Sequence, residues 1–379
     1  MNYALSTIWY ERQRFLPAVL AVAFSAVLIA VQGGLMLGLF STVSIPVDKA
    51  RADLWVGYPG VRSVDLGRQI PERWASRIAA QPEVERVEPC SVGFALWVKA
   101  TAPDAPPATP EVVTVVGAKI GPDSLGAVEH LRRQPELMAK LAEPFTVVVD
   151  QSELGRLGVR RLGDQAEVTG RRVRVVGTVR GYTSIGGPYV FCSLQTARAL
   201  LREPTGAATY LLARCRTPAA ADAVAARLQK YERMSAFTAD EFSTRSRLHW
   251  LFTTKAGVAV GFTALLGLVV GAVVTSQTLY SATAASQREF ATLRAMGIPR
   301  WRLKLTVVEQ SFWVGLFGVV CAAPVTVLLA ELGNRAGTQV WLHPVVVLAA
   351  AGITMLMALG AGLAALRSFQ GVDPAHNIR

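Results

Sequence analysis

Histidine and cysteine are the residues of this chain with the most obvious capacity for catalysis or metal binding, and their spacing supports neither. The four histidines, His130, His249, His343 and His376, are scattered along the sequence. No HExxH, GxSxG or CxxC pattern is present, and these are motifs of zinc proteases, serine hydrolases and thiol redox centres. We therefore expect no catalytic residue and no metal site.

The cysteines have a plainer interpretation. Cys90, Cys192 and Cys215 lie in a long stretch of ordinary globular composition, whereas Cys321 lies in an apolar run. Three cysteines permit at most one disulfide and leave one thiol over. Buried free thiols that act as small apolar residues are favoured over a redox role.

The sequence contains four long apolar runs, and they decide the class of the protein. The 379 residues are 51% hydrophobic and 17% charged, with a mean hydropathy of +0.34. Each run holds about 20 residues or more, which is what a helix needs to cross a hydrocarbon core of roughly 30 Å. The first run, 15–40, carries no charge and is too long for the apolar part of a signal peptide. The sequence therefore predicts an α-helical membrane protein with four transmembrane helices.

Basic residues indicate how these helices are oriented. Lysine and arginine exceed aspartate and glutamate by 39 to 27. No nucleic-acid-binding motif accompanies this excess, and basic residues beside membrane spans are expected on the cytoplasmic side. The segment 281–306 carries Arg288, Arg294, Arg300, Arg302 and Lys304, and the segment 333–344 carries Arg335 alone among basic residues other than His343. Both termini are therefore predicted to be cytoplasmic, with 41–250 on the outside.

The predicted organisation follows from the runs and the loops between them. Its parts are a cytoplasmic segment 1–14, a first transmembrane helix 15–40, an external domain 41–250, a second transmembrane helix with its stalk 251–280, a cytoplasmic loop 281–306, a third transmembrane helix 307–332, an external loop 333–344, a fourth transmembrane helix 345–366 and a cytoplasmic C-terminus 367–379. Trp250, directly before the stalk, is expected to be an anchor at the membrane interface.

Short helices alternate with strand-like runs in 41–250. A hairpin is predicted to turn at 169–171, and the helix 217–234 is expected to offer an apolar face made of Ala223, Ala226, Leu228 and Tyr231. This mixture indicates a large α+β domain inserted between the first and second transmembrane helices.

Pairs of glycines four residues apart mark places where helices can approach closely in lipid. The pairs are Gly34 and Gly38, Gly257 and Gly261, and Gly267 and Gly271. Packing within one subunit and packing between two copies remain equally open for them.

The layout and two sequence stretches resemble one known family. One span, a large external α+β domain and three further spans are the arrangement of the FtsX/MacB-type (type VII) permeases of ABC transporters. The loop SQREFATLRAMGIPRWRLKL, 286–305, is similar to the cytoplasmic signature of that family, and LGVRRLGDQAEVTGRRVRVVGTV, 157–179, is similar to its Gly-Asp hairpin theme. The amino end, ALSTIWYERQRFLPAVLAVAFSAVLIAVQGGL followed by ARADLWVGYP, resembles the DevC branch, which exports envelope glycolipids.

The resemblance implies partners. A phosphate-binding loop needs a Gly-Lys pair, and this chain has none, so ATP and Mg would be bound by a separate ABC ATPase and this chain would hold no cofactor. The family pattern implies a homodimer in the inner membrane, working with a membrane-fusion adaptor and an outer-membrane channel. The chain is expected to contact the lipid bilayer and not to bind nucleic acid.

The same resemblance assigns a role to the cytoplasmic loop. It implies a coupling helix seated on the ATPase, with polar contacts from Arg288, Glu289 and Arg294 and an apolar anchor made of Phe290, Leu293 and Met296. Gly297, followed by Pro299, is expected to end the helix. The alternative is a basic segment that only sets topology, but such a segment needs neither Glu289 nor an apolar face.

The function that the resemblance implies is mechanotransmission, in which ATP-driven movement of the spans does work outside the cytoplasm. The expected cargo is a lipid, glycolipid, peptide or other amphiphile. An FtsX-like regulator of a cell-wall hydrolase and lipoprotein extraction of the LolC/LolE kind are the alternatives. FtsX-like members have a much smaller external domain, so the size of 41–250 favours export.

Overall fold

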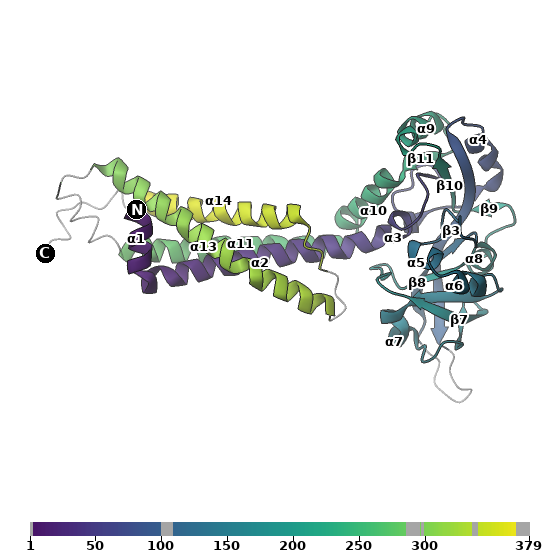
Figure 1. The fold of residues 1–379 in the computed structure, drawn as a ribbon, viewed down its shortest axis with the longest axis horizontal. Helices are drawn as coiled ribbons and strands as arrows, with labels where there is room; N and C mark the ends of the chain where they lie inside the picture. Colours follow the sequence, from purple (N-terminus) through teal and green to yellow (C-terminus); the bar gives the residue numbers. More distant parts are fainter. Residues whose placement is uncertain (1–2, 100–108, 286–295, 297–298, 336–339, 369–379) are drawn as a thin grey trace. The chain divides into compact units, whose positions relative to one another are not determined.

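The computed structural model describes residues 3–99, 109–285, 296, 299–335 and 340–368 (Figure 1). The chain divides into two compact units. We call Met1–Gly38 with Val258–Arg379 the helical unit, and Leu39–Gly257 the α+β unit.

The helical unit is a bundle of long apolar helices. Its described helices are α1 (Tyr3–Tyr10), α2 (Arg12–Ser41), α11 (Lys255–Ala285), α13 (Arg300–Arg335) and α14 (Pro344–Ser368), of which α2 and α11 run on into the other unit. Four segments of the described residues are long and apolar enough to cross a membrane: Arg12–Asp48, Lys255–Thr278, Lys304–Arg335 and Pro344–Ala364. Small residues let these helices pack closely, as where Gly318 of α13 touches Val22 of α2.

The α+β unit is built on one large sheet. Its strands are β1 (Leu54–Gly57), β2 (Ile70–Pro71), β3 (Val84–Lys99), β4 (Glu111–Ala118), β5 (Thr146–Asp150), β6 (Gln165–Val168), β7 (Arg171–Val179), β8 (Tyr189–Ser193), β9 (Ala207–Ala208), β10 (Tyr210–Cys215) and β11 (Ser235–Thr238). Nine of them form a sheet in the order β11-β1-β10-β3-β4-β8-β5-β7-β6, and β2 pairs with β9.

Short helices fill the connections between these strands. The α-helices are α3 (Ile45–Asp48), α4 (Ala75–Ala79), α5 (Glu129–Arg132), α6 (Pro135–Leu141), α7 (Leu154–Leu157), α8 (Leu194–Leu201), α9 (Ala221–Leu228) and α10 (Ala239–Thr253). Single 3-10 turns lie at η1 (Thr42–Ser44), η2 (Val64–Leu66), η3 (Glu72–Trp74), η4 (Gln151–Glu153) and η5 (Pro218–Ala220). The mixture of helices and strands agrees with the predicted α+β class.

The long strand β3 belongs to two substructures. Its first half pairs with β10, and its second half pairs with β4 and, near Lys99, with β6. Because β6 also pairs with β7, the strands β3, β4, β8, β5, β7 and β6 close into a ring. Residues that point inside the ring alternate with residues that point outside, as the period of a strand requires.

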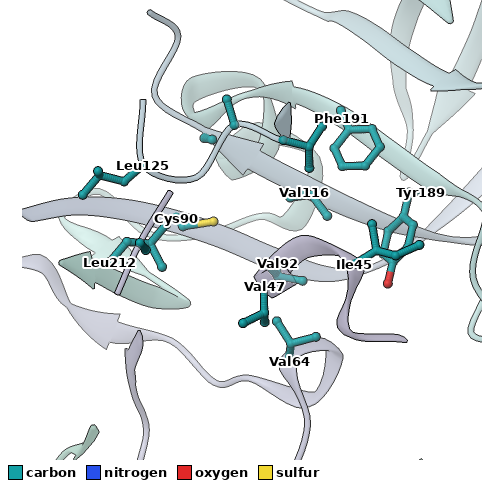
Figure 2. Close-up of a cluster of buried hydrophobic side chains, with 14 of the residues drawn as sticks. Ile45, Val47, Val64, Cys90, Val92, Val116, Leu125, Tyr189, Phe191 and Leu212 are labelled. Atoms are coloured by element: carbon teal, nitrogen blue, oxygen red, sulfur yellow. The ribbon is translucent and has the colours of Figure 1, made fainter. Parts of the chain in front are cut away.

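Three apolar cores stabilise the α+β unit. Trp97, Val113 and Val149 are among the side chains that fill the ring of strands. A second core lies between β1, β10 and the helices α4 and α9. The third contains Ile45 and Val47 of α3, and Figure 2 shows both near Tyr189 and Val92.

One helix prediction in this unit needs correction. The buried residues of α9 are Ala221, Val224, Ala225 and Leu228, so the predicted face with Ala223, Ala226 and Tyr231 was wrong apart from Leu228. The larger Val224 and Leu228 direct the helix toward the core, and Tyr231 follows its end.

Candidate functional site

Two short segments connect the α+β unit to the long apolar helices. The first connector, Thr42–Asp48, consists of η1 and α3 and follows α2. The second connector is α10, which precedes α11. Both belong to the α+β unit, so their mutual contacts can be described directly.

The first connector is held by the core. Every residue from Thr42 to Val47 is buried. The Tyr189 hydroxyl lies 2.9 Å from the carbonyl oxygen of Thr42 and 3.0 Å from that of Val43. Burial raises the pKa of Tyr189, so its hydroxyl stays protonated and can donate to these carbonyls. The end of α2 is thereby fixed to strand β8.

The second connector presents an inner face to the unit. Thr238 caps its start, because its hydroxyl accepts a hydrogen bond from the Glu241 amide at 3.3 Å. Phe242, Ser243 and Ser246 are buried, and the Phe242 ring stacks on that of Phe237 with centroids 5.3 Å apart. The stacking of Phe242 on Phe237 therefore holds the first turn of α10 against the unit.

An arginine on α10 joins the two connectors. Arg247 Nε donates to Ser44 Oγ at 2.7 Å, and its Nη2 lies 2.5 Å from Asp48 Oδ2. Ser44 Oγ in turn donates to Asp48 at 2.7 Å. The Arg247 and Asp48 side chains are 34% and 28% exposed, so solvent screens the pair and its contribution is about 1 kcal/mol. We call Ser44, Asp48 and Arg247 the clasp.

A second set of contacts fastens α10 to the segment around η2. The Val64 amide donates to Ser246 Oγ at 3.1 Å, and Trp250 Nε1 lies 3.2 Å from both carboxylate oxygens of Asp65. Ser63 also donates to the buried Asp65. The indole N–H of Trp250 is therefore paired inside the α+β unit, and the expected place of Trp250 at the membrane interface stays a prediction.

We call the clasp, together with the contacts of Ser246 and Trp250 with Val64 and Asp65, the joint. The described residues contain no group of three or more histidine, cysteine, aspartate or glutamate side chains that could hold a metal ion. All four cysteines are free, and Cys90, Cys192 and Cys215 are buried. What the clasp can do is make the ends of the first and second connectors move together.

Most of the predicted coupling residues lie outside the described part of the chain. These are Arg288, Glu289, Phe290, Leu293, Arg294 and Gly297. Met296 is described, and its side chain is 71% exposed. Helix α13 then begins at Arg300.

One predicted glycine pair faces another helix of the same chain. A Cβ at Gly267 would lie 3.3 Å from Leu28 of α2, and one at Gly271 would lie 3.1 Å from Ser25. Ser25 Oγ is 3.1 Å from the carbonyl oxygen of Gly271 and 3.1 Å from the hydroxyl of Thr275. These small residues bring α2 and α11 into contact.

The other two pairs behave differently. Gly34 accepts a hydrogen bond from the Trp341 amide at 3.0 Å, and Gly38 lies in the last two turns of α2. A Cβ at Gly257 would collide with the carbonyl oxygens of Trp250 and Leu251, whereas one at Gly261 would have no neighbour within 4 Å. Gly257 therefore permits the tight junction between α10 and α11.

Two family models match the chain. The MacB-like periplasmic core domain matches residues 15–231, and the FtsX-like permease C-terminal domain matches residues 261–372. Together with the apolar helices, these matches define a multi-pass membrane permease with a periplasmic domain. The chain belongs to the FtsX/MacB-like family of ABC transporter permeases. The α+β unit is its periplasmic part, and α10 lies between the two matched regions.

Three solved structures are similar to the periplasmic part. The periplasmic region of MacB from Actinobacillus actinomycetemcomitans is 12% identical, with a TM-score of 0.34 over 52% of this chain and 94% of that one. The extracellular domain of the ABC-type transporter YknZ from Gram-positive bacteria is 11% identical, with a TM-score of 0.32 over 48% and 98%. A domain of a permease protein from Porphyromonas gingivalis is 13% identical, with a TM-score of 0.30 over 55% and 97%. No curated protein matches the sequence.

Proposed function

We propose that this chain is the mechanotransmission permease of an ATP-driven export system in the inner membrane, and that a separate ATPase supplies the ATP and Mg chemistry. The observation that carries this proposal is the clasp, because Arg247 on the second connector binds Ser44 and Asp48 on the first. A displacement of α2 or of α11 would then be passed to the periplasmic part through the two connectors that the clasp joins. The cargo is a lipid, glycolipid, peptide or other amphiphile.

The proposed assembly is a homodimer on two ATPase subunits, with a membrane-fusion adaptor and an outer-membrane channel. Helix α11 supports the homodimer, because 11% of its apolar segment is buried within the chain, against 33% for Arg12–Asp48. The exposed Phe262, Leu265 and Val269 of α11 are free for a second copy or for lipid.

The proposed topology has four spans with both termini in the cytoplasm. It predicts that a cysteine at Asp123 reacts with an impermeant thiol reagent in spheroplasts, because Asp123 is exposed on the periplasmic part. A cysteine at the exposed Met296 should not react. Labelling of Met296→Cys from outside would contradict this topology.

Export through the clasp can be tested in proteoliposomes that contain the chain and its partner ATPase. Arg247→Ala is expected to leave assembly and ATP hydrolysis in place while export falls, because the helices no longer move the periplasmic part as one body. Arg233→Ala is the matched control, since Arg233 is exposed and lies outside the clasp. Normal export by Arg247→Ala would contradict the proposal.

The contact with the ATPase needs a separate test. Leu293→Asp is expected to abolish recovery of the ATPase with the permease, because an apolar hot spot of about 2 kcal/mol or more is lost. Glu289→Ala is expected to leave a complex whose ATP use no longer drives export, because charged contacts fix orientation more than affinity. If both variants assemble and export normally, the segment 286–297 is not the coupling element.

A further inference from the structure

A strip of apolar side chains is uncovered on the outside of the ring of strands. Phe94 and Leu96 of β3 are 42% and 51% exposed, and Val112 of β4 is 46% exposed. Leu96 lies directly opposite Val112, and Phe94 is two residues away on the same face of β3. We call these three residues the outer strip. Contiguous exposed apolar surface of this kind commonly marks a binding site.

One end of the outer strip reaches the second connector. A Cβ built on Gly186 would lie 3.6 Å from the Phe94 ring and 3.5 Å from the Trp250 ring. The two aromatic side chains therefore border the same glycine. Trp250 is the residue of α10 that binds Asp65, so the outer strip begins beside the joint described above.

Arginines surround the other end. The Thr169 amide donates to the Leu96 carbonyl at 2.9 Å, which places the turn between β6 and β7 next to the strip. Arg202 Nη2 donates to the Thr169 carbonyl at 3.4 Å. The exposed Arg172 lies opposite Glu167, on the face of the hairpin that does not point into the ring. Glu167 offsets one of these two positive charges, which leaves one in excess.

The backbone around the strip is already paired. β3 pairs with β10, β4 and β6, and β4 pairs with β3 and β8. A peptide therefore finds no open edge for strand addition. A two-fold contact in which the two strips run in the same direction would bring two positively charged hairpins together, which like charges oppose. A hydrocarbon chain needs only apolar contact and meets neither obstacle.

We propose that the outer strip is a docking site for one anionic amphiphile. Its hydrocarbon chain lies along Phe94, Leu96 and Val112, and its carboxylate or phosphate lies at Arg172 and Arg202. This inference rests on the proposed function and narrows its cargo to the anionic class. Gly186, which both Phe94 and Trp250 border, lies between the site and the joint.

The probe for the test is a sixteen-carbon fatty acid with a mid-chain diazirine, and the alcohol of the same chain is its neutral partner. Both are photolysed with the full chain in neutral detergent, without the ATPase, and the labelled peptides are mapped. Labelling by the acid is expected to be saturable and centred on β3 and β4. Arg172→Gln with Arg202→Gln should lower this labelling about five-fold, because exposed ion pairs contribute up to about 1 kcal/mol. Labelling by the alcohol should not change.

A second variant tests the apolar part. Leu96→Asp should abolish labelling of the strip by both probes, and Leu162→Asp is the matched control, because Leu162 is an exposed leucine in a loop away from β3 and β4. Equal labelling by acid and alcohol at the strip, or labelling spread over exposed apolar residues without saturation, would overturn the docking site. If the unaltered chain shows this labelling but drives no export in proteoliposomes with its partner ATPase, the docking site stands and the proposed function is overturned.

Discussion

The two connectors differ in what holds them. The first is continuous with α2, since Ser41 and Ile45 are helical on either side of η1, and its residues Thr42–Val47 are buried in the core. The second is held at its start by Phe242, which is buried in the same core, and further along by polar side chains. An extended residue, Thr254, follows it (φ −88°, ψ 150°). Movement of α2 is therefore expected to reach the periplasmic part directly, whereas movement of α11 has to pass through the junction at Thr254 and Gly257 and then through the clasp.

The two connectors therefore differ in the interactions that must break before each one separates from the periplasmic part. Releasing the first connector requires opening an apolar core, which is a large fraction of the stability of a domain. Releasing the part of the second connector after Phe242 requires breaking a half-exposed ion pair and a few hydrogen bonds. The second connector is therefore the place where coupling can be changed without unfolding.

The largest expected effect comes from breaking the first connector. Val47→Asp places a charge at a site that is 2% exposed in the core, and we expect a loss of about 4 kcal/mol in the free energy of unfolding. Thermal unfolding of the full chain in detergent, followed by near-ultraviolet circular dichroism, measures it. Lys49→Ala, an exposed neighbour, should change little. Similar unfolding of both variants would show that the core does not hold this connector.

The junction after α10 gives the next effect. Gly257→Ala sets a Cβ against two backbone oxygens, which cannot move aside as a side chain can, and we expect a cost of about 2 kcal/mol. Gly261→Ala has open space around it and should be neutral or gain up to about 1 kcal/mol from helix propensity. Hydrogen exchange at residues 250–257 distinguishes the two variants. Equal protection in both would mean that the junction is not tight.

The clasp itself contributes less. Arg247→Ala is expected to cost about 1 kcal/mol, since the ion pair is screened. A double-mutant cycle with Asp48→Asn should recover a coupling energy of about the same size. Additive effects in the cycle would mean that Arg247 and Asp48 do not interact in solution.

The smallest expected effect lies between α2 and α11. Ser25→Ala removes the hydrogen bonds to Gly271 and Thr275, and polar contacts between membrane helices average about 0.6 kcal/mol. Thr263→Ala is the control, because the Thr263 hydroxyl bonds to its own helix at Ala259. Resistance to denaturation in mixed micelles measures both. A loss of several kcal/mol for Ser25→Ala would make this contact, rather than the clasp, the main connection.

Much of this fold could be predicted from local sequence signals. The run of three valines at 147–149 and the turn at 169–171 predict β5 and the β6–β7 hairpin, and both are present. The closure of the ring could not be predicted, because β3 and β6 pair residues such as Val98 and Glu167 that are 69 positions apart in the chain (167 − 98 = 69). The face of α9 was misjudged because alanines occupy both sides of that helix.

The joint was less accessible from the sequence than the fold. Arg247 and Trp250 stand out next to an apolar run, and that position favours a membrane anchor. Their partners Asp48 and Asp65 lie about two hundred residues earlier, and no local pattern connects them. The seven coupling residues between Arg288 and Gly297 were proposed from a resemblance, and six of them fall outside the described part of the chain.

The most direct test is a distance between the two connectors during the ATP cycle. Spin labels at Lys49→Cys and Leu248→Cys, both exposed positions, can be introduced with Cys321→Ser. Burial raises the pKa of the Cys90, Cys192 and Cys215 thiols, so these stay protonated and unlabelled. With the partner ATPase, the connectors are expected to keep one narrow distance with and without ATP, and Arg247→Ala should broaden it. A distance that changes with ATP in the otherwise unaltered chain would contradict the clasp as the element that moves both helices together.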